Sequence, residues 1–343
     1  MYRWLRPILF QLDPEQAHDL TVYLLHQLGR FPRLSLALRR LLIPGTPRRV
    51  DFCGLEFPNP LGLAAGYDKD GTAWKGLVGL GFGHVEVGTV TPRPQSGNPR
   101  PRIFRHPPAR AVINRMGFPG KGGRFVAEQL QPRGAGGLRD EIILGVNIGK
   151  NKDTPNQEAV KDYLFLLREF APLADYLVVN VSSPNTIGLR RLQARDHLES
   201  LLTALVEARE DLDLPAGLPL PILVKLAPDL TDPELEDALE AVAQAGVDGV
   251  VATNTTVKRP GPAASVYDQE GGLSGQPLRE MSTEMITKIS QWTGGDLPII
   301  GVGGISSLED GREKIEAGAS LVQVYTGLVY RGPLLVRKMV RKL

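Results

Sequence analysis

The sequence contains few cysteine, histidine and aromatic residues. Of its 343 residues one is cysteine (Cys53), five are histidine and 6% are aromatic. A single cysteine excludes an internal disulfide and disfavours a cysteine-based metal site. The histidines are scattered and form no HExxH motif or His/Asp cluster, so the sequence predicts no metal ion. None of them adjoins a candidate serine nucleophile, which disfavours a Ser-His-Asp hydrolase.

Long hydrophobic runs are also missing. No apolar stretch approaches the ~20 residues that a membrane span requires. Residues 1–16 hold only a short apolar patch and no small-residue cleavage site, which is unlike a secretory signal. Together with the single cysteine, this indicates a protein that works in a reducing cytoplasm. The 42% of hydrophobic residues suffice for a large core, and the length suits one barrel with a small extension.

The net charge of +2 is unevenly distributed. Residues 1–49 carry eight Lys or Arg and three Asp or Glu, a balance of +5, which leaves −3 for residues 50–343. A near-neutral body argues against nucleic acid as a partner. The basic arm is where an acidic partner or an anionic lipid surface would bind.

Two helices are predicted in this arm. Asp13, Pro14 and Gln16 form a helix start, and leucines follow at helical spacing as far as Leu28. Residues 32–43 form a second leucine-rich, basic segment that ends at a Pro-Gly pair. These helices could pack on the main domain, lie in a membrane interface, or do both.

After this arm, short apolar runs alternate with helical patterns. The runs predict eight strands, at residues 61–64, 85–90, 142–148, 176–181, 222–226, 249–253, 299–303 and 321–324. Eight strands with helices between them favour a closed parallel barrel, a (β/α)8 fold with a two-helix amino-terminal extension. Two long insertions, 91–119 and 255–277, follow strands, and such insertions belong to the catalytic face of a barrel.

Polar or glycine residues follow every predicted strand at the same relative place. Parallel strand ends meet at one rim, so this pattern predicts a large, mostly uncharged ligand at the barrel mouth. The last two ends, residues 301–305 and 325–327, are glycine-rich, as in barrels that bind phosphate through backbone N–H groups. The alternative is that these glycines form ordinary tight turns.

Lysines and amides at the strand ends indicate which chemical groups the ligand carries. Lys69 and Lys225 follow apolar runs, where an ammonium group would be available to a ligand anion or a flavin ring nitrogen. Amides both donate and accept hydrogen bonds, which suits a planar substrate with carboxylate, carbonyl and N–H groups. The amides in question are Asn114, Asn180, Asn185 and Asn254.

Residues 180–185 form the most informative strand end, because an apolar run stops there in a cluster of amides and hydroxyls. These residues could simply terminate a strand in an Asx-turn. If Ser183 is catalytic, it acts as a base toward a carbon acid. A hydroxyl is a poor base unless nearby donors stabilise its alkoxide and water removes its proton.

Ordered motifs over nearly the whole chain resemble the dihydroorotate dehydrogenases, specifically the membrane-associated, quinone-reducing class 2 branch. The motifs are NPLGLAAGYDKDG (59–71), VEVGTVTPRPQ (85–95), NPRPRIFR (98–105), INRMGF (113–118), VNIGKNKDT (146–154), VNVSSPNTIGLR (179–190), VKLAPDL (224–230), VATNTT (251–256), GGLSG (271–275), GVGGI (301–305) and VYTG (324–327). The resemblance implies a helical membrane and quinone-tunnel extension at residues 1–46 and an FMN-binding catalytic barrel at 47–343.

The resemblance also implies residue roles. One non-covalent FMN per chain would be bound by Ala65, Gly66, Tyr67, Asp68, Lys69, Thr89, Asn147, Asn180, Lys225, Thr253, Gly275, Gly304, Tyr325 and Thr326. Dihydroorotate would be bound by Lys69, Asn114, Arg115, Met116, Gly117, Phe118, Asn180, Asn185, Asn254 and Thr255. Ser183 would take the C5 proton while hydride leaves C6, giving orotate for pyrimidine synthesis. His18, Arg105 and Tyr325 would line the inner end of a tunnel that leads a membrane quinone to the flavin.

Two features indicate class 2. The soluble class 1 branch uses a cysteine base, whereas here the active-site loop carries Ser183 and the single cysteine, Cys53, precedes the first barrel strand. The second feature is the helical extension. Three residues are unusual for the family: Tyr67, Ile187 in the active-site loop, and Thr326. Ile187 stands where proline is common, so it should loosen the loop that closes over substrate. A monomer at the cytoplasmic side of the cell membrane is expected.

Three other functions remain open on the sequence. A barrel aldolase would use Lys225 as a Schiff-base nucleophile. A tRNA-modifying flavin barrel would need a nucleic-acid surface, which the balance of −3 disfavours. A membrane-attached binding barrel would use the polar strand ends for recognition alone.

Overall fold

The computed structural model describes residues 2–45, 47–132, 134–186, 188–214, 220–260 and 268–343. Eight strands close into a parallel barrel, in which the last strand, β13, pairs with the first, β3. They are β3 (Leu61–Leu63), β4 (His84–Val90), β7 (Ile143–Ile148), β8 (Tyr176–Asn180), β9 (Ile222–Leu226), β10 (Gly249–Ala252), β12 (Ile299–Val302) and β13 (Leu321–Val324). The predicted barrel is confirmed, and each predicted strand end lies within one residue of the observed end.

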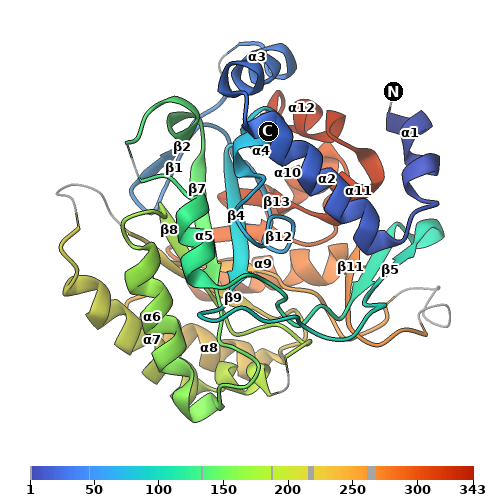
Figure 1. Ribbon diagram of the computed structural model, residues 1–343. Coiled ribbons are helices and arrows are strands. Elements are labelled where there is room, and N and C mark those ends of the chain that lie inside the picture. The colour runs from blue at the N-terminus through green and yellow to red at the C-terminus, as the bar shows by residue number, and fades with distance from the viewer. Residues whose placement is uncertain (1, 46, 133, 187, 215–219, 261–267) are drawn as a thin grey trace.

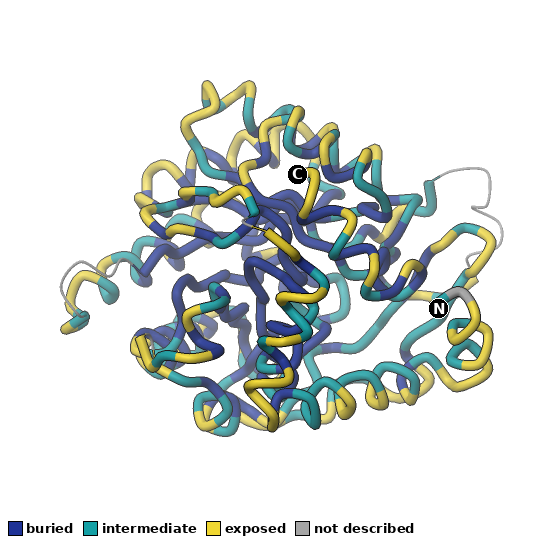
Figure 2. Tube along the Cα trace, turned by 90° about the horizontal axis from the view of Figure 1, so that it is seen from above, coloured by how far each residue is buried: buried dark blue, intermediate teal, exposed yellow. Residues whose placement is uncertain are grey.

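Helices surround the barrel, and the strands between them are buried on both faces (Figures 1 and 2). Continuous apolar runs such as β4, buried at all seven positions, are what a parallel sheet covered on both faces requires. The helices are α4 (Trp74–Val78), α5 (Gly123–Gln129), α6 (Ala159–Phe170), α7 (Arg195–Glu210), α8 (Asp232–Gln244), α9 (Arg279–Trp292), α10 (Leu308–Glu316), α11 (Thr326–Arg331) and α12 (Leu334–Val340).

The amino-terminal extension contains three helices instead of the two predicted. α2 (Pro14–Gly29) and α3 (Pro32–Leu42) are confirmed, and Asp13 caps α2 by accepting hydrogen bonds from the N–H groups of Glu15 and Gln16. α1 (Tyr2–Leu9) was not predicted. It is short, contains a proline and lacks a local start signal, and tertiary contacts hold it in place. The Tyr2 hydroxyl donates to the Val329 carbonyl of α11 at 2.5 Å.

The extension packs against the barrel through α4. A Cβ atom at Gly76 in α4 would lie 2.0 Å from the Leu25 carbonyl oxygen of α2, so only glycine permits this approach. Arg39 of α3 donates to the carbonyls of Val78 and Phe82. No helix in the described ranges is long and apolar enough to cross a membrane.

The two long insertions pair with each other. β5 (Ile103–His106) and β6 (Ala111–Asn114) come from the first insertion, and β11 (Gly272–Gly275) from the second. β6 is the central strand of the antiparallel sheet that they form, which lies beside α1 and α2 (Figure 1). At the opposite end of the barrel, a hairpin of β1 (Val50–Phe52) and β2 (Leu55–Phe57) packs its apolar side chains across the barrel interior.

His84 is fully buried at this closed end, between the rings of Phe57 and Tyr176. A Cβ atom at Gly62 would lie 2.1 Å from its Nε2 atom, so glycine makes room for the imidazole. Neither ring nitrogen has a hydrogen-bond partner in the described part of the chain. Burial lowers the pKa of His84 to about 3, so the folded protein holds the ring neutral.

Acid should therefore destabilise the protein through His84. The unfolded state binds the proton below about pH 6.5 while the folded state resists it to about pH 3, so stability is lost as the pH falls through this window. Between pH 7 and pH 5 the loss should be about 2 kcal/mol. Urea unfolding at both pH values should show a loss that is about 2 kcal/mol smaller in His84→Leu than in the wild type. The control His197→Leu, at an exposed histidine, should behave as the wild type.

Candidate functional site

One cavity of about 430 Å³ lies at the carboxyl ends of the barrel strands and continues between the barrel, α1 and α2. Its size is that of a small-molecule site. Most of the predicted site residues line it: His18, Ala65, Gly66, Tyr67, Lys69, Thr89, Arg105, Asn114, Met116, Gly117, Phe118, Asn180, Ser183, Asn185, Lys225, Thr253, Asn254, Thr255, Gly275, Gly304, Tyr325 and Thr326. Segments far apart in the sequence are thus brought to one site.

Three predicted residues, Asp68, Arg115 and Asn147, do not line the cavity. Buried Asp68 accepts hydrogen bonds from the N–H groups of Thr72 and Ala73, both at 2.9 Å, and burial raises its pKa to about 6. It therefore shapes the loop that carries Tyr67. The Arg115 guanidinium stacks on a neighbouring phenylalanine ring and donates to a backbone carbonyl.

Asn147 lies below the cavity and positions residues that line it. Its side-chain oxygen accepts hydrogen bonds from Thr89 Oγ1 at 2.5 Å and from Asn180 Nδ2 at 3.1 Å. Its Nδ2 donates to Glu86 Oε1 at 2.7 Å. Asn147 thus acts on the cavity through Thr89 and Asn180.

The four predicted amides converge from separate strands and loops. Asn185 Nδ2 donates to Asn114 Oδ1 at 3.1 Å, which joins the loop after β8 to β6. Asn254 Nδ2 lies 2.9 Å from Ser182 Oγ and 3.3 Å from Asn180 Oδ1. Together these side chains offer donors and acceptors to a polar planar ligand.

Ser183 is buried and lines the cavity beside these amides. Its Oγ accepts a hydrogen bond from the Asn185 N–H at 3.3 Å. In the described ranges no carboxylate or imidazole hydrogen-bonds to it. The serine therefore lacks the partner of a hydrolase nucleophile, and backbone N–H is the kind of donor that would stabilise an alkoxide.

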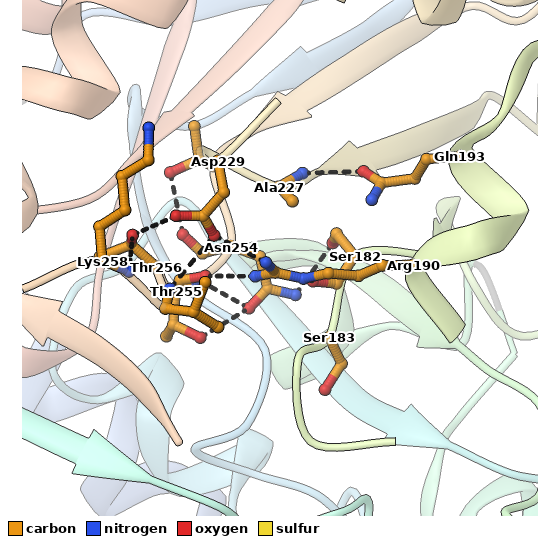
Figure 3. A network of polar contacts seen from close by, with 12 residues as sticks. Ser182, Ser183, Arg190, Gln193, Ala227, Asp229, Asn254, Thr255, Thr256 and Lys258 are labelled. Carbon is orange, nitrogen blue, oxygen red and sulfur yellow. Dashed lines mark hydrogen bonds and ion pairs between the residues drawn. The ribbon is translucent and has the colours of Figure 1, made fainter. Parts of the chain in front are cut away.

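Arg190 ties the loop that carries Ser183 to two neighbouring strand ends (Figure 3). Its guanidinium donates to Asp229 Oδ2 at 2.7 Å and to the carbonyls of Ser182 and Thr255, each at 3.0 Å. Ser183 points away from this network (Figure 3). Arg190 and Asp229 were not predicted as site residues, because their role is visible only once three loops are brought together.

Lys69 and His18 form a polar pair where α2 meets the cavity. The two side-chain nitrogens lie 3.3 Å apart. Burial and the nearby Lys69 charge hold the pKa of His18 well below its usual value, so the imidazole is neutral and can accept a hydrogen bond from the ammonium group. Burial also lowers the pKa of Lys69, against the opposing effect of Asp19. Tyr67 lies next to this pair and donates to Thr21 Oγ1 at 3.0 Å.

Glycines form a cradle at the end of the cavity near α9. Gly275 and Gly304 have φ values of +94° and +75°. A Cβ atom at Gly304 would lie 2.4 Å from the Arg279 Cα, and one at Gly275 would lie 2.3 Å from the Arg110 carbonyl oxygen. Ser274 Oγ and Thr326 Oγ1 lie 2.8 Å apart beside them. Such backbone, with hydroxyls next to it, fits a phosphate group.

Several lining residues were not predicted, among them Arg110, Ser274, Gln276, Ser306 and Gln323. Ser274 lies inside a motif, GGLSG, which was recognised only for its last glycine. Gln323 is a polar residue inside an apolar strand, and this break in the apolar pattern is the sequence signal that could have identified it as a lining residue. Among the described residues there is no group of three or more His, Cys, Asp or Glu that could hold a metal ion.

A closed parallel barrel whose carboxyl rim lines a deep, mostly apolar cavity with convergent amides defines a (β/α)8-barrel protein with a small-molecule site. The family model described as dihydroorotate dehydrogenase matches residues 48–343, and the chain belongs to this family.

Known proteins resemble the chain over almost its full length. It is 50% identical to a dihydroorotate dehydrogenase (quinone) of Stutzerimonas stutzeri, over 99% of this chain and 97% of the relative. It is also 50% identical to one of Acidithiobacillus ferrooxidans, over 100% and 94%. The crystal structure of the Eimeria tenella enzyme in complex with ferulenol superposes with a TM-score of 0.87 at 40% identity, covering 97% of this chain and 93% of that one. These matches favour the dehydrogenase over the aldolase and tRNA-modifying alternatives.

Proposed function

We propose that this protein oxidises dihydroorotate to orotate with a bound FMN and passes the electrons to a membrane quinone, as a step of pyrimidine (UMP) biosynthesis. The observation that carries the proposal is the single cavity in which Ser183, the four amides, Lys225 and the glycine cradle meet. The quinone-dependent relatives at about 50% identity support it.

The residues present fit FMN. Gly275 and Gly304 line the cavity with backbone that carries no side chain, and the Ser274 and Thr326 hydroxyls lie next to them, which suits a phosphate group. Ala65, Gly66, Thr89, Asn180, Lys225 and Thr253 line the part of the cavity above the barrel interior, where the flavin ring would bind. Bound FMN supplies the two-electron chemistry that links substrate to quinone.

The amide cluster would hold the substrate. Asn114, Asn180, Asn185 and Asn254 offer paired donors and acceptors to its carbonyl and N–H groups. The Lys69 ammonium group would bind its carboxylate. Thr255 and residues 116–118, which line the cavity, would complete the site. Because the amides come from different loops, they fix the orientation of the reacting carbon.

Ser183 would remove the C5 proton. Its hydroxyl lies among the amides and receives a hydrogen bond from the Asn185 N–H, which supports an alkoxide. Burial of Ser183 limits competition from bulk water. Arg190 holds the loop through the Ser182 carbonyl and so keeps the base in position.

The extension would lead quinone from the membrane to the flavin. His18, Tyr67, Arg105 and Tyr325 line the stretch of cavity between α1, α2 and the barrel. Ten of the thirteen exposed large apolar side chains in the described residues belong to the extension: Trp4, Leu5, Ile8, Leu12, Leu20, Tyr23, Leu24, Phe31, Leu34 and Leu41. With the +5 charge of residues 1–49, they suit peripheral binding to an anionic membrane. On this basis residues 1–46 act as the membrane and tunnel segment and 47–343 as the catalytic barrel, in a monomer at the cytoplasmic side of the cell membrane.

The test is to purify the full chain, identify any released flavin by mass, and measure dihydroorotate-dependent reduction of a soluble quinone analogue. We expect about one FMN per chain and substrate-dependent quinone reduction. A colourless protein that traps a carbonyl substrate on Lys225 under borohydride would support an aldolase instead.

A further inference from the structure

Glu86 is a fully buried carboxylate on β4, and no step above uses it. It lies inside the barrel, below the cavity. Its Oε1 accepts hydrogen bonds from Asn147 Nδ2 at 2.7 Å and from Lys225 Nζ at 3.5 Å, and its Oε2 accepts one from Gln323 Nε2 at 2.8 Å. The three donors come from β7, β9 and β13, so the carboxylate joins four barrel strands (Figure 1).

Each of these donors also acts on the cavity. Lys225 and Gln323 line it, and Asn147 positions Thr89 and Asn180, which line it too. A buried carboxylate costs several kcal/mol unless charged and polar groups compensate it. Lys225 is the cation that pairs with Glu86 in the described ranges. The pair therefore sets the direction of the ammonium group at the cavity floor and compensates its charge.

We propose that Glu86 is a positioning residue for the redox reaction, which keeps the Lys225 ammonium group aimed at the flavin and compensates its charge, and so sets how readily the flavin accepts electrons. The inference rests on the proposed function, because it requires a flavin in the cavity. Removing the Glu86 charge leaves Lys225 uncompensated. The site then becomes more positive, and a more positive site favours reduction, which adds negative charge.

Other titratable groups near Glu86 do not change charge at neutral pH. Tyr176 on β8 has its pKa raised well above its usual value by burial and by the Glu86 carboxylate, and His84 on β4 has its pKa lowered to about 3 by burial. Both stay neutral between pH 6 and pH 9. Lys225 is therefore the charged partner that Glu86→Gln leaves without compensation.

The experiment compares the flavin midpoint potential of the full-length holoprotein with those of Glu86→Gln, Lys225→Met and the double variant at one neutral pH. In Glu86→Gln we expect the equilibrium constant for two-electron reduction to rise about tenfold, or about 30 mV. The effect of Glu86→Gln in the Lys225→Met background should differ from its effect in the wild type, because Glu86 also orients Lys225. The double variant carries neither buried charge, so it remains informative if the single variant does not fold.

Asp175→Asn is the matched control. Asp175 is a buried carboxylate paired with Arg139 at 2.8 Å, away from the cavity, and its loss should leave the potential unchanged. An unchanged potential in Glu86→Gln, or effects of the two substitutions that simply add in the double variant, would overturn the role of Glu86. A wild type that binds FMN and is reduced by dihydroorotate would still uphold the proposed function, so the two failures can be told apart.

Discussion

Ser183→Ala should slow the reduction of bound flavin by dihydroorotate by about 10²- to 10⁴-fold, the usual contribution of a general base. FMN should stay bound, because the glycine cradle and Lys225 are untouched. The physical reason is that the Ser183 hydroxyl accepts a hydrogen bond from the Asn185 N–H and lies among the asparagine side chains that would hold the substrate. The measurement is anaerobic stopped-flow absorbance after mixing with substrate, with the bound FMN quantified beforehand.

Thr186→Val provides a control in the same loop. Thr186 is also buried, but its hydroxyl has no hydrogen-bond partner in the described residues, and valine has nearly its shape. We expect its rate to stay within about threefold of wild type, since no polar contact is lost. If Ser183→Ala reduced its flavin as fast as Thr186→Val, Ser183 would not be the base.

Removing residues 1–43 should spare flavin reduction by dihydroorotate and lower quinone reduction by about 10²-fold, the cost of losing the groups that orient a reactant. α1 and α2 line the outer part of the cavity, whereas the amides and Ser183 belong to the barrel and its loops. The truncation should therefore leave flavin reduction by dihydroorotate intact and impair quinone reduction. The two half-reactions are measured by single-turnover flavin reduction and by steady-state turnover with a quinone in liposomes.

A point variant covers the case in which the truncated chain does not fold. Ala17→Trp adds a large side chain to the lining of the passage, while Gln16→Trp adds the same group at an exposed position of α2 that does not line it. Only Ala17→Trp should lose quinone reduction. Equal quinone turnover in the two variants would argue against the passage.

The barrel was predictable because its signal is local. Buried parallel strands need continuous apolar runs, and the order of eight such runs with polar ends already defines a rim. The same logic predicted Ser183, the amides Asn180, Asn185 and Asn254, and Gly304 as neighbours, whereas Gly275 was implied only by the family resemblance. It did not predict α1, which is held by contacts such as that of Tyr2 with Val329, more than 300 residues away.

Residues that act through others were harder to predict. Glu86 is an acidic residue inside an apolar run. Its three hydrogen-bond donors lie on other strands, so the sequence alone does not show that they contact it. In the sequence, Arg190 and Asp229 look like ordinary charged loop residues. Their salt bridge becomes visible only in the folded structure. The expected effect of Ile187 on loop closure remains a prediction, because Ile187 lies outside the described residues.

The most direct test of the account is the visible absorption spectrum of the purified, full-length protein under anaerobic conditions, before and after dihydroorotate is added. We predict the spectrum of an oxidised flavin before the addition and its bleaching afterwards, with recovery when a quinone is supplied. A protein without flavin absorbance, or a bound flavin that dihydroorotate leaves oxidised, would contradict the central claim that this cavity brings a flavin and dihydroorotate together at Ser183.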